Sequence, residues 1–256
     1  MKADKYSKVR SADGFPGRCV TLLAALFLAG LAHAQPLPLF SASYKVSYGI
    51  LRGEMTLELR RTGDAGYFYE TSLTPRGFVT LFKRGSIVET TSLRIEDGRV
   101  VPMDYRSIDT IANPTRNIVY RFDDPPGRVT GVYKQNTVDE PMRAGGQNRI
   151  SAHVAVMFAM NAGADMTAIS VFDRARWRDF EFEVFPGQVV ETKLGEFDTA
   201  EIRYASDDKD KSWSLYCAEA LDYAPVMIVY REDGDVKSKA QLIEFESLDG
   251  NASDEP

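Results

Sequence analysis

The segment Arg52-Gly-Glu-Met-Thr-Leu-Glu-Leu-Arg60 decides the fold class. Its apolar side chains, Met55, Leu57 and Leu59, alternate with polar ones, and this period of two is typical of a β-strand with one buried and one solvated face. A helix would instead repeat its apolar positions every three to four residues. The segment therefore predicts a sheet that has one face in the core of the protein.

The same alternation recurs along the chain, with turn-forming sequences between the segments. Asp97-Gly98 and Asp233-Gly234 are short hairpin turns whose backbone geometry suits the twist of paired strands. Further strands are predicted at 42–50, 67–73, 86–96, 117–122, 128–134, 179–185, 188–193, 199–205, 213–217, 225–232 and 237–247. Many strands joined by tight turns favour an antiparallel meander over parallel strands with crossover connections.

One segment, Asn148–Met160, departs from this alternation. It is rich in Ala and Met, lacks Gly and Pro, and is followed by the helix stop Asn161-Ala-Gly163. Its apolar positions repeat at helical spacing, as in Ile150, Val154, Met157 and Phe158. The predicted fold is mainly β, a large curved antiparallel sheet or partly closed β-barrel (meander), with one helix packed on it or plugging it.

Residues 1–34 have the three parts of a cleavable signal peptide. Five basic residues lie in the first 18 positions, an apolar run extends from Cys19 to Leu31, and Ala32-His33-Ala34 offers small side chains for cleavage. The apolar run has 13 residues, whereas a bilayer-spanning helix needs about 20. We therefore expect cleavage and no transmembrane segment in the mature chain. An uncleaved anchor and a misassigned start codon are the alternatives.

The predicted mature chain, residues 35–256, is long enough to bury a core as one domain. We expect a single β domain at 35–248 and a disordered polar tail at 249–256. Export favours the periplasm over full secretion, and Gln35, rather than a cysteine, follows the cleavage site, so no lipid anchor is predicted.

Charge and cysteine content narrow the partners of the mature chain. Residues 1–34 hold five of the 31 basic and two of the 37 acidic residues, which leaves a net charge of −9 for residues 35–256. An acidic surface repels phosphate backbones, so we expect no nucleic-acid partner. Cys217 is the one cysteine left after cleavage, and its apolar surroundings predict a buried free thiol.

The mature chain is poor in catalytic motifs. Its one histidine, His153, lies inside the predicted helix without a metal ligand three or four residues away, so no metal site is predicted. There is no Gly-x-Ser-x-Gly elbow, and Gly145-Gly146 lacks the lysine of a phosphate-binding loop. We predict no catalytic residues and no cofactor, and so a protein that is not an enzyme.

Carboxylates leave one enzymatic alternative open. Glu181 and Glu183 lie two residues apart on one strand face, and glycosidases use two carboxyl groups that can be distant in sequence. The alternative function is therefore a carboxylate-dependent hydrolase that acts on envelope polysaccharide.

Aromatic residues supply the candidate ligand site. Core packing and cross-strand pairing are the commoner role of such residues in a sheet. The functional hypothesis is that a curved sheet presents the aromatic residues on a concave apolar face, which binds a lipid-like or other hydrophobic molecule. The predicted ligand-binding residues are Tyr44, Tyr48, Tyr69, Phe78, Phe82, Trp177 and Trp213.

Three stretches together resemble the bacterial family called domain of unknown function 3108. They are Phe40–Glu54, Ser170–Arg176 with its continuation Val190–Ala200, and Trp213–Val226. Their shared features are an early glycine in the first hairpin, a Gly-x-Phe-Asp turn, and a tryptophan strand followed by Tyr-x-Pro-Val. Cys217 and Ala218 depart from the family pattern, which often has a small and an acidic residue there.

The resemblance implies an exported, β-rich protein without established catalysis, similar in shape to the curved sheet-and-helix bodies of periplasmic lipoprotein carriers. Together with the residue patterns, it predicts a non-enzymatic periplasmic protein that binds a hydrophobic or lipid-like ligand, or a protein of the cell envelope. An interaction-only protein with a filled barrel and an exposed apolar patch or sheet edge is a third alternative.

Overall fold

The computed structural model describes residues 36–63, 66–77, 80, 84–205 and 210–249. The predicted signal peptide, and the predicted tail beyond Asp249, lie outside these residues. No helix in the described part of the chain is long and apolar enough to cross a membrane.

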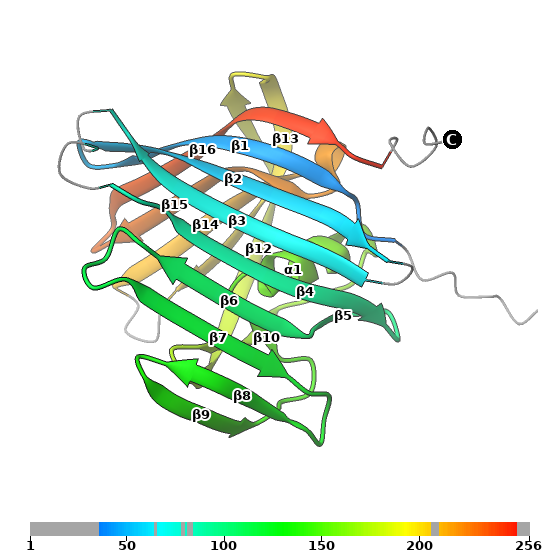
Figure 1. The fold of residues 1–256 in the computed structure, drawn as a ribbon. Coiled ribbons are helices and arrows are strands. Elements are labelled where there is room, and N and C mark those ends of the chain that lie inside the picture. Colours follow the sequence, from blue (N-terminus) through cyan, green and yellow to red (C-terminus); the bar gives the residue numbers. More distant parts are fainter. Residues whose placement is uncertain (1–35, 64–65, 78–79, 81–83, 206–209, 250–256) are drawn as a thin grey trace, which may run out of the picture. The chain divides into compact units, whose positions relative to one another are not determined.

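The structure is mainly β, as predicted, and the sixteen strands of the described residues form one sheet (Figure 1). The strands are β1 (Phe40–Tyr48), β2 (Leu51–Thr62), β3 (Gly66–Arg76), β4 (Ile87–Glu96), β5 (Arg99–Pro102), β6 (Asp104–Asp109), β7 (Arg116–Phe122), β8 (Arg128–Tyr133), β9 (Asn136–Pro141), β10 (Gln147–Asn148), β11 (Ala168–Asp173), β12 (Arg176–Thr192), β13 (Gly195–Ala205), β14 (Lys211–Ala218), β15 (Ala224–Glu232) and β16 (Asp235–Ser247). The described helices are α1 (Ser151–Asn161) and the short 3-10 helix η2 (Glu219–Leu221).

The order of strands follows the meander that the tight turns predict. It runs β10-β11-β12-β13-β14-β15-β16-β1-β2-β3-β4-β6-β7-β8-β9, with β5 beside β4. Neighbouring strands are antiparallel, except that β10 and β11 are parallel. Because β1 and β16 pair in the middle of this order, the first and last strands of the chain join its two halves.

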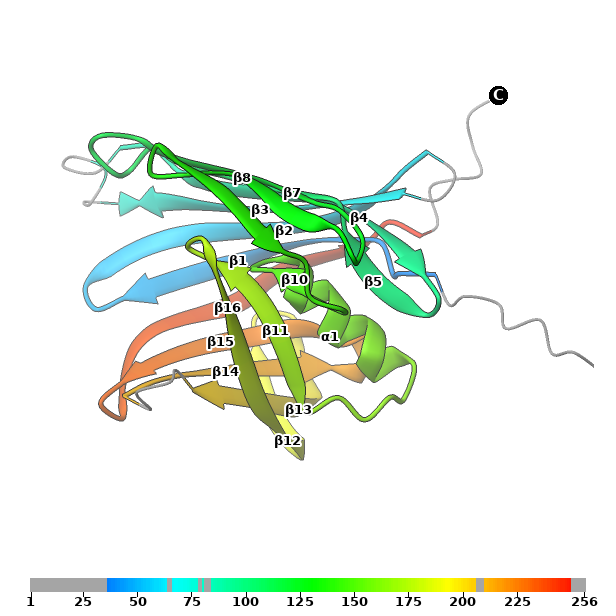
Figure 2. The same ribbon diagram turned by 90° about the horizontal axis from the view of Figure 1, so that it is seen from below.

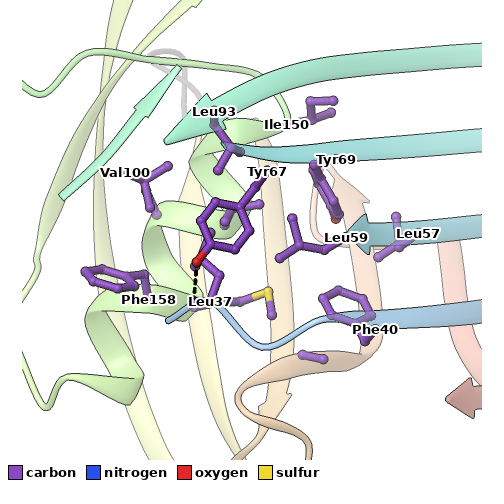
Figure 3. Close-up of a cluster of buried hydrophobic side chains, with 14 of the residues drawn as sticks. Leu37, Phe40, Leu57, Leu59, Tyr67, Tyr69, Leu93, Val100, Ile150 and Phe158 are labelled. Atoms are coloured by element: carbon purple, nitrogen blue, oxygen red, sulfur yellow. Dashed lines mark hydrogen bonds between the residues drawn. The ribbon is translucent and has the colours of Figure 1, made fainter. Parts of the chain in front are cut away.

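The inner face of β2 shows how the alternating pattern builds the core. Leu57 and Leu59 are buried, and Leu59 lies opposite Phe40 of β1 and Tyr69 of β3, which are buried as well. Figure 3 shows these side chains together with Phe158 of α1, which belongs to the same cluster. Each buried side chain of this size contributes about 1.5–3 kcal/mol to folding.

Helix α1 lies on the concave side of the sheet, between the strands around β3 and those around β14 (Figure 2). It begins three residues later than predicted, because Asn148 stands in β10 and its Oδ1 accepts the backbone N–H groups of Ile150 (3.1 Å) and Ser151 (2.9 Å). It ends at the predicted stop, where Gly163 adopts a φ of +63°.

The two ends of the sheet meet through side chains. Phe172 of β11 packs against Tyr120 of β7, with ring centroids 5.1 Å apart, and the Tyr120 hydroxyl accepts the Ala175 backbone N–H at 3.1 Å. Trp177 of β12 contacts Phe172 at 5.1 Å between centroids, and its Nε1 donates to the Pro141 carbonyl at 3.0 Å. The β7–β9 end therefore overlaps the β11–β12 hairpin, and the sheet is rolled without a closed hydrogen-bonded barrel.

Several strand predictions were incomplete. The segments 179–185 and 188–193 are one strand, β12, because Phe185-Pro-Gly187 forms an irregularity in the pairing with β13 rather than a turn. Strands β5, β6, β9, β10 and β11 were not predicted. They are short, and β10 has two polar residues that are buried by tertiary contacts.

Shortening Phe172 to alanine should destabilise the protein by about 3–5 kcal/mol, because its buried ring joins the two ends of the sheet. Urea unfolding followed by far-UV circular dichroism measures this change. Val189→Ala, at an exposed position on β12, is the control and should change stability by less than about 0.5 kcal/mol. Equal effects of the two substitutions would contradict the role assigned to Phe172.

Candidate functional site

A row of aromatic rings crosses four neighbouring strands. Phe180 of β12 meets Tyr204 of β13 with centroids 5.6 Å apart, Tyr204 stacks on Trp213 of β14 at 5.3 Å, and Trp213 meets Tyr230 of β15 at 5.1 Å. Tyr204, Trp213 and Tyr230 are directly paired across the strands, so they lie on one face of the sheet. We call these four residues the aromatic row.

The aromatic row lies on the same face as α1. Ile202 and Leu215, two residues along β13 and β14 from the row, are buried in a cluster that includes Val156 and Met160 of α1. Side chains two residues apart on a strand share a face. The four rings of the row are only partly buried, so α1 covers this inner face incompletely.

Next to the aromatic row, a pocket of about 280 Å³ lies between α1 and the strands β12 and β13. Val156 and Met160 line it from the helix, and Phe182 and Ile202 line it from the sheet. Phe182 pairs directly with Tyr204 of the row. The pocket and the row therefore form one apolar region, which we call the inner surface.

Arg149 brings a positive charge to the inner surface. Its Nε lies 3.6 Å from Oε1 of Glu89 on β4, and the Tyr105 hydroxyl of β6 also donates to this carboxylate. The charge of Arg149 also acts on Tyr204 of β13. Yet 46% of the Arg149 side chain is exposed. Its electrostatic partners thus come from β4 and β6 and from β13, which are far apart in the strand order.

Arg178 lies on the inner face of β12, in the alternating set that contains Phe180 and Phe182. It is partly buried and stands opposite Val171 of β11. Its Nε is buried and has no hydrogen-bond partner among the described residues. A buried donor of a charged group that lacks a partner is costly, so this atom has unused hydrogen-bonding capacity.

Burial shapes the titration of the groups around the inner surface. Desolvation, and then the charge of Arg149, lower the pKa of His153 to about 4. Desolvation raises the pKa of Tyr204 to about 12, against the opposing effect of Arg149. It also raises the pKa of the buried Cys217 thiol to about 12. At neutral pH all three groups are uncharged.

The structure separates the seven predicted ligand residues. Tyr44 and Tyr69 are buried in the core, and the Tyr44 hydroxyl donates to the Pro225 carbonyl at 2.7 Å. Trp177 belongs to the contact between the two ends of the sheet, where its indole also packs over Gly146. These three side chains are structural, because their rings and polar atoms are already used by the fold.

Two other predicted residues lie on the same face of the sheet as the aromatic row, and the last two lie outside the described residues. Trp213 is part of the row. Tyr48, which is 52% exposed, pairs with Ser238 of β16, and Ser238 pairs in turn with Tyr230 of the row. Phe78 and Phe82 lie outside the described residues.

Sequence reasoning did not predict Phe180, Tyr204, Tyr230, Arg149 or Arg178 as site residues. The three aromatic residues lie beside Trp213 because of the register in which the strands pair. The sequence of a single strand does not show this register. Arg178 lies on β12, the strand of Phe180, and Arg149 lies two residues before α1. Only the rolling of the sheet brings these elements together.

Among the described side chains, no group of three or more His, Cys, Asp or Glu is placed to hold a metal ion. Glu181 and Glu183 are both exposed and lie on the face of β12 opposite to Phe180 and Phe182.

A second depression, of about 650 Å³, lies on the outer face of β14–β16 beneath the end of β12. Tyr216, Lys193 and Lys239 are among its lining residues. It is separated from the inner surface by the sheet itself, because Tyr216 alternates with the inner-face residues Leu215 and Cys217.

These features define a class of mainly β, barrel-like proteins in which a rolled open sheet surrounds one helix. The chain belongs to the family described as "Protein of unknown function (DUF3108)", whose model matches residues 41–241. This match confirms the family resemblance seen in the sequence.

One solved structure extends the comparison to the fold. A β-barrel-like protein of domain of unknown function DUF1849 from Brucella abortus is similar, with a TM-score of 0.56 and 15% identity. The match covers 84% of this chain and 100% of that chain. At this identity the likeness shows the fold alone. No curated protein matches.

His153 should make the protein less stable in mild acid. Its folded-state pKa of about 4 lies below the unfolded value of about 6.5, so the unfolded state binds more protons between these values. The free energy of unfolding should therefore fall, by at most about 3 kcal/mol, as the pH drops from 6.5 to 4. Urea unfolding of the wild type and His153→Gln at several pH values measures the difference, and identical pH profiles would contradict this assignment.

Proposed function

We propose that this protein is a non-enzymatic, exported protein of the periplasm that binds a hydrophobic, lipid-like ligand on the inner surface. The observation that carries the proposal is the half-buried aromatic row beside an apolar pocket, on the face that α1 covers incompletely. The signal-like residues 1–34 support export.

The physical argument concerns apolar area in contact with water. An aromatic side chain buries about 150–250 Å² when it is fully covered, at roughly 25 cal/mol per Å². The rings of the aromatic row are held in place by one another, so a ligand that covers them gains this energy without ordering flexible side chains. A concave apolar region with a few polar groups is the usual form of a small-molecule site.

The titration of the nearby groups supports a binding role over catalysis. The low pKa of His153 makes its imidazolium form scarce at neutral pH, and the raised pKa of Cys217 keeps its thiol protonated. Neither state suits a proton donor or a thiolate nucleophile. Binding to an envelope protein and hydrolysis of a polysaccharide remain alternatives, which ligand titration separates from the proposal.

The proposal predicts saturable binding of hydrophobic probes near Trp213. In a Trp177→Phe background, Trp213 is the one remaining tryptophan of the chain, and its fluorescence reports on the aromatic row. Titration with a panel of lipids and alkyl probes should give a saturable change. The absence of such a change with every probe would overturn the proposal.

Two tyrosine variants locate the site. Tyr230→Ala removes a half-buried ring of the row and should weaken probe binding about tenfold, a loss of about 1.4 kcal/mol. Tyr216→Ala removes a half-buried ring on the outer face of the neighbouring strand and should leave binding unchanged. A larger effect of Tyr216→Ala would place the ligand on the outer face instead.

A further inference from the structure

Two arginines near the inner surface indicate which charge the ligand carries. Nearly half of the Arg149 side chain is exposed, and its charge acts on Tyr204 of the aromatic row. Arg178 has a buried Nε without a partner among the described residues. The two arginines lie in one neighbourhood. Asp173, whose charge acts on Arg149, is two residues from Val171, the strand partner of Arg178.

The carboxylates near these arginines already have other partners. Glu89 is only 11% exposed and accepts a hydrogen bond from Tyr105, so it is recessed behind Arg149. Asp173 lies 3.6 Å from the Nε of Arg174. The groups left to meet a ligand are therefore the two guanidinium groups.

An apolar path leads away from these charges. The charge of Arg149 acts on both His153 and Tyr204, and the next inner-face residue of β13, Ile202, lines the apolar pocket. Val156, one turn beyond His153 on α1, lines the same pocket. A molecule with its polar end at Arg149 would thus meet aromatic and then aliphatic side chains along its length.

We propose that the ligand of the inner surface is a single-chain amphiphile with an anionic head group, a carboxylate or a phosphate, which Arg149 and Arg178 bind. This inference rests on the proposed function and specifies its ligand. The guanidinium groups donate hydrogen bonds to the anionic oxygens, as arginine does to carboxylates and phosphates. The alkyl chain covers the aromatic row and enters the pocket between α1 and β12–β13.

The net charge of the protein opposes the binding of anions. A measured preference for an anionic head group would therefore point to a specific site. Residues 35–256 carry a net charge of −9, so the protein as a whole repels anions. A preference for an anionic head group over a neutral one must then come from local cations. Local cations stand at the inner surface, as Arg149 and Arg178, and at the outer depression, as Lys193 and Lys239.

The test compares dodecanoate, dodecyl phosphate and dodecanol by calorimetric titration of the purified protein, below the concentrations at which they form micelles. At least one of the two anions should bind about tenfold or more tightly than dodecanol, as expected for charge-assisted hydrogen bonds. A preference for one anion identifies the head group as carboxylate or phosphate, and both results support the proposal. This comparison needs no variant.

Charge variants then locate the head group. Arg149→Gln and Arg178→Gln should each reduce the preference for the anion about tenfold, while dodecanol binding stays the same. Glu89→Gln should strengthen anion binding several-fold, because it removes the carboxylate that competes for Arg149. The pair Lys193→Gln and Lys239→Gln is the matched control on the outer face and should have no effect. Thermal unfolding of each variant checks that it is folded.

The outcomes separate this inference from the proposed function. Equal affinity for the anions and dodecanol would overturn the anionic head group and leave hydrophobic binding intact. Failure of all three probes to bind would overturn both. Loss of anion binding in the lysine variants, with the arginine variants unchanged, would overturn the site at Arg149 and Arg178.

Discussion

The packing of Phe172 against Tyr120 determines what the sheet encloses, because it joins two ends that are far apart in the strand order. The hydrogen-bonded order of the described strands ends at β10 on one side and β9 on the other. A sheet with a continuous apolar face must cover that face, and its exposed edges invite pairing with other chains. Here the β7–β9 end lies over the β11–β12 hairpin, and aromatic side chains hold the overlap together.

This rolled arrangement makes the interior larger than α1 alone can fill. The helix packs Val154, Met157 and Phe158 into the main core, and its other side reaches Phe182 and Ile202 through Val156 and Met160. Beyond that contact the aromatic row remains partly exposed. The fold therefore leaves an apolar surface, bordered by two arginines, inside the rolled sheet.

Much of the architecture could be predicted from local sequence. The alternation of Leu57 and Leu59 with polar residues, the Asp-Gly turns and the helical spacing around Val154 depend on neighbouring residues, and each predicted the right element. The site could not be predicted in the same way. Tyr44 and Trp213 look alike as aromatic residues in strands, but Tyr44 is fully buried in the core and Trp213 is only partly buried. That difference depends on where α1 lies across the rolled sheet, which is a tertiary property.

The account is tested most directly by native mass spectrometry of the protein isolated from the periplasm, followed by solvent extraction and identification of the molecules that travel with it. The account predicts one bound amphiphile per chain, with a carboxylate or phosphate head group. A bare protein mass that persists after incubation with dodecanoate, dodecyl phosphate and dodecanol would contradict it.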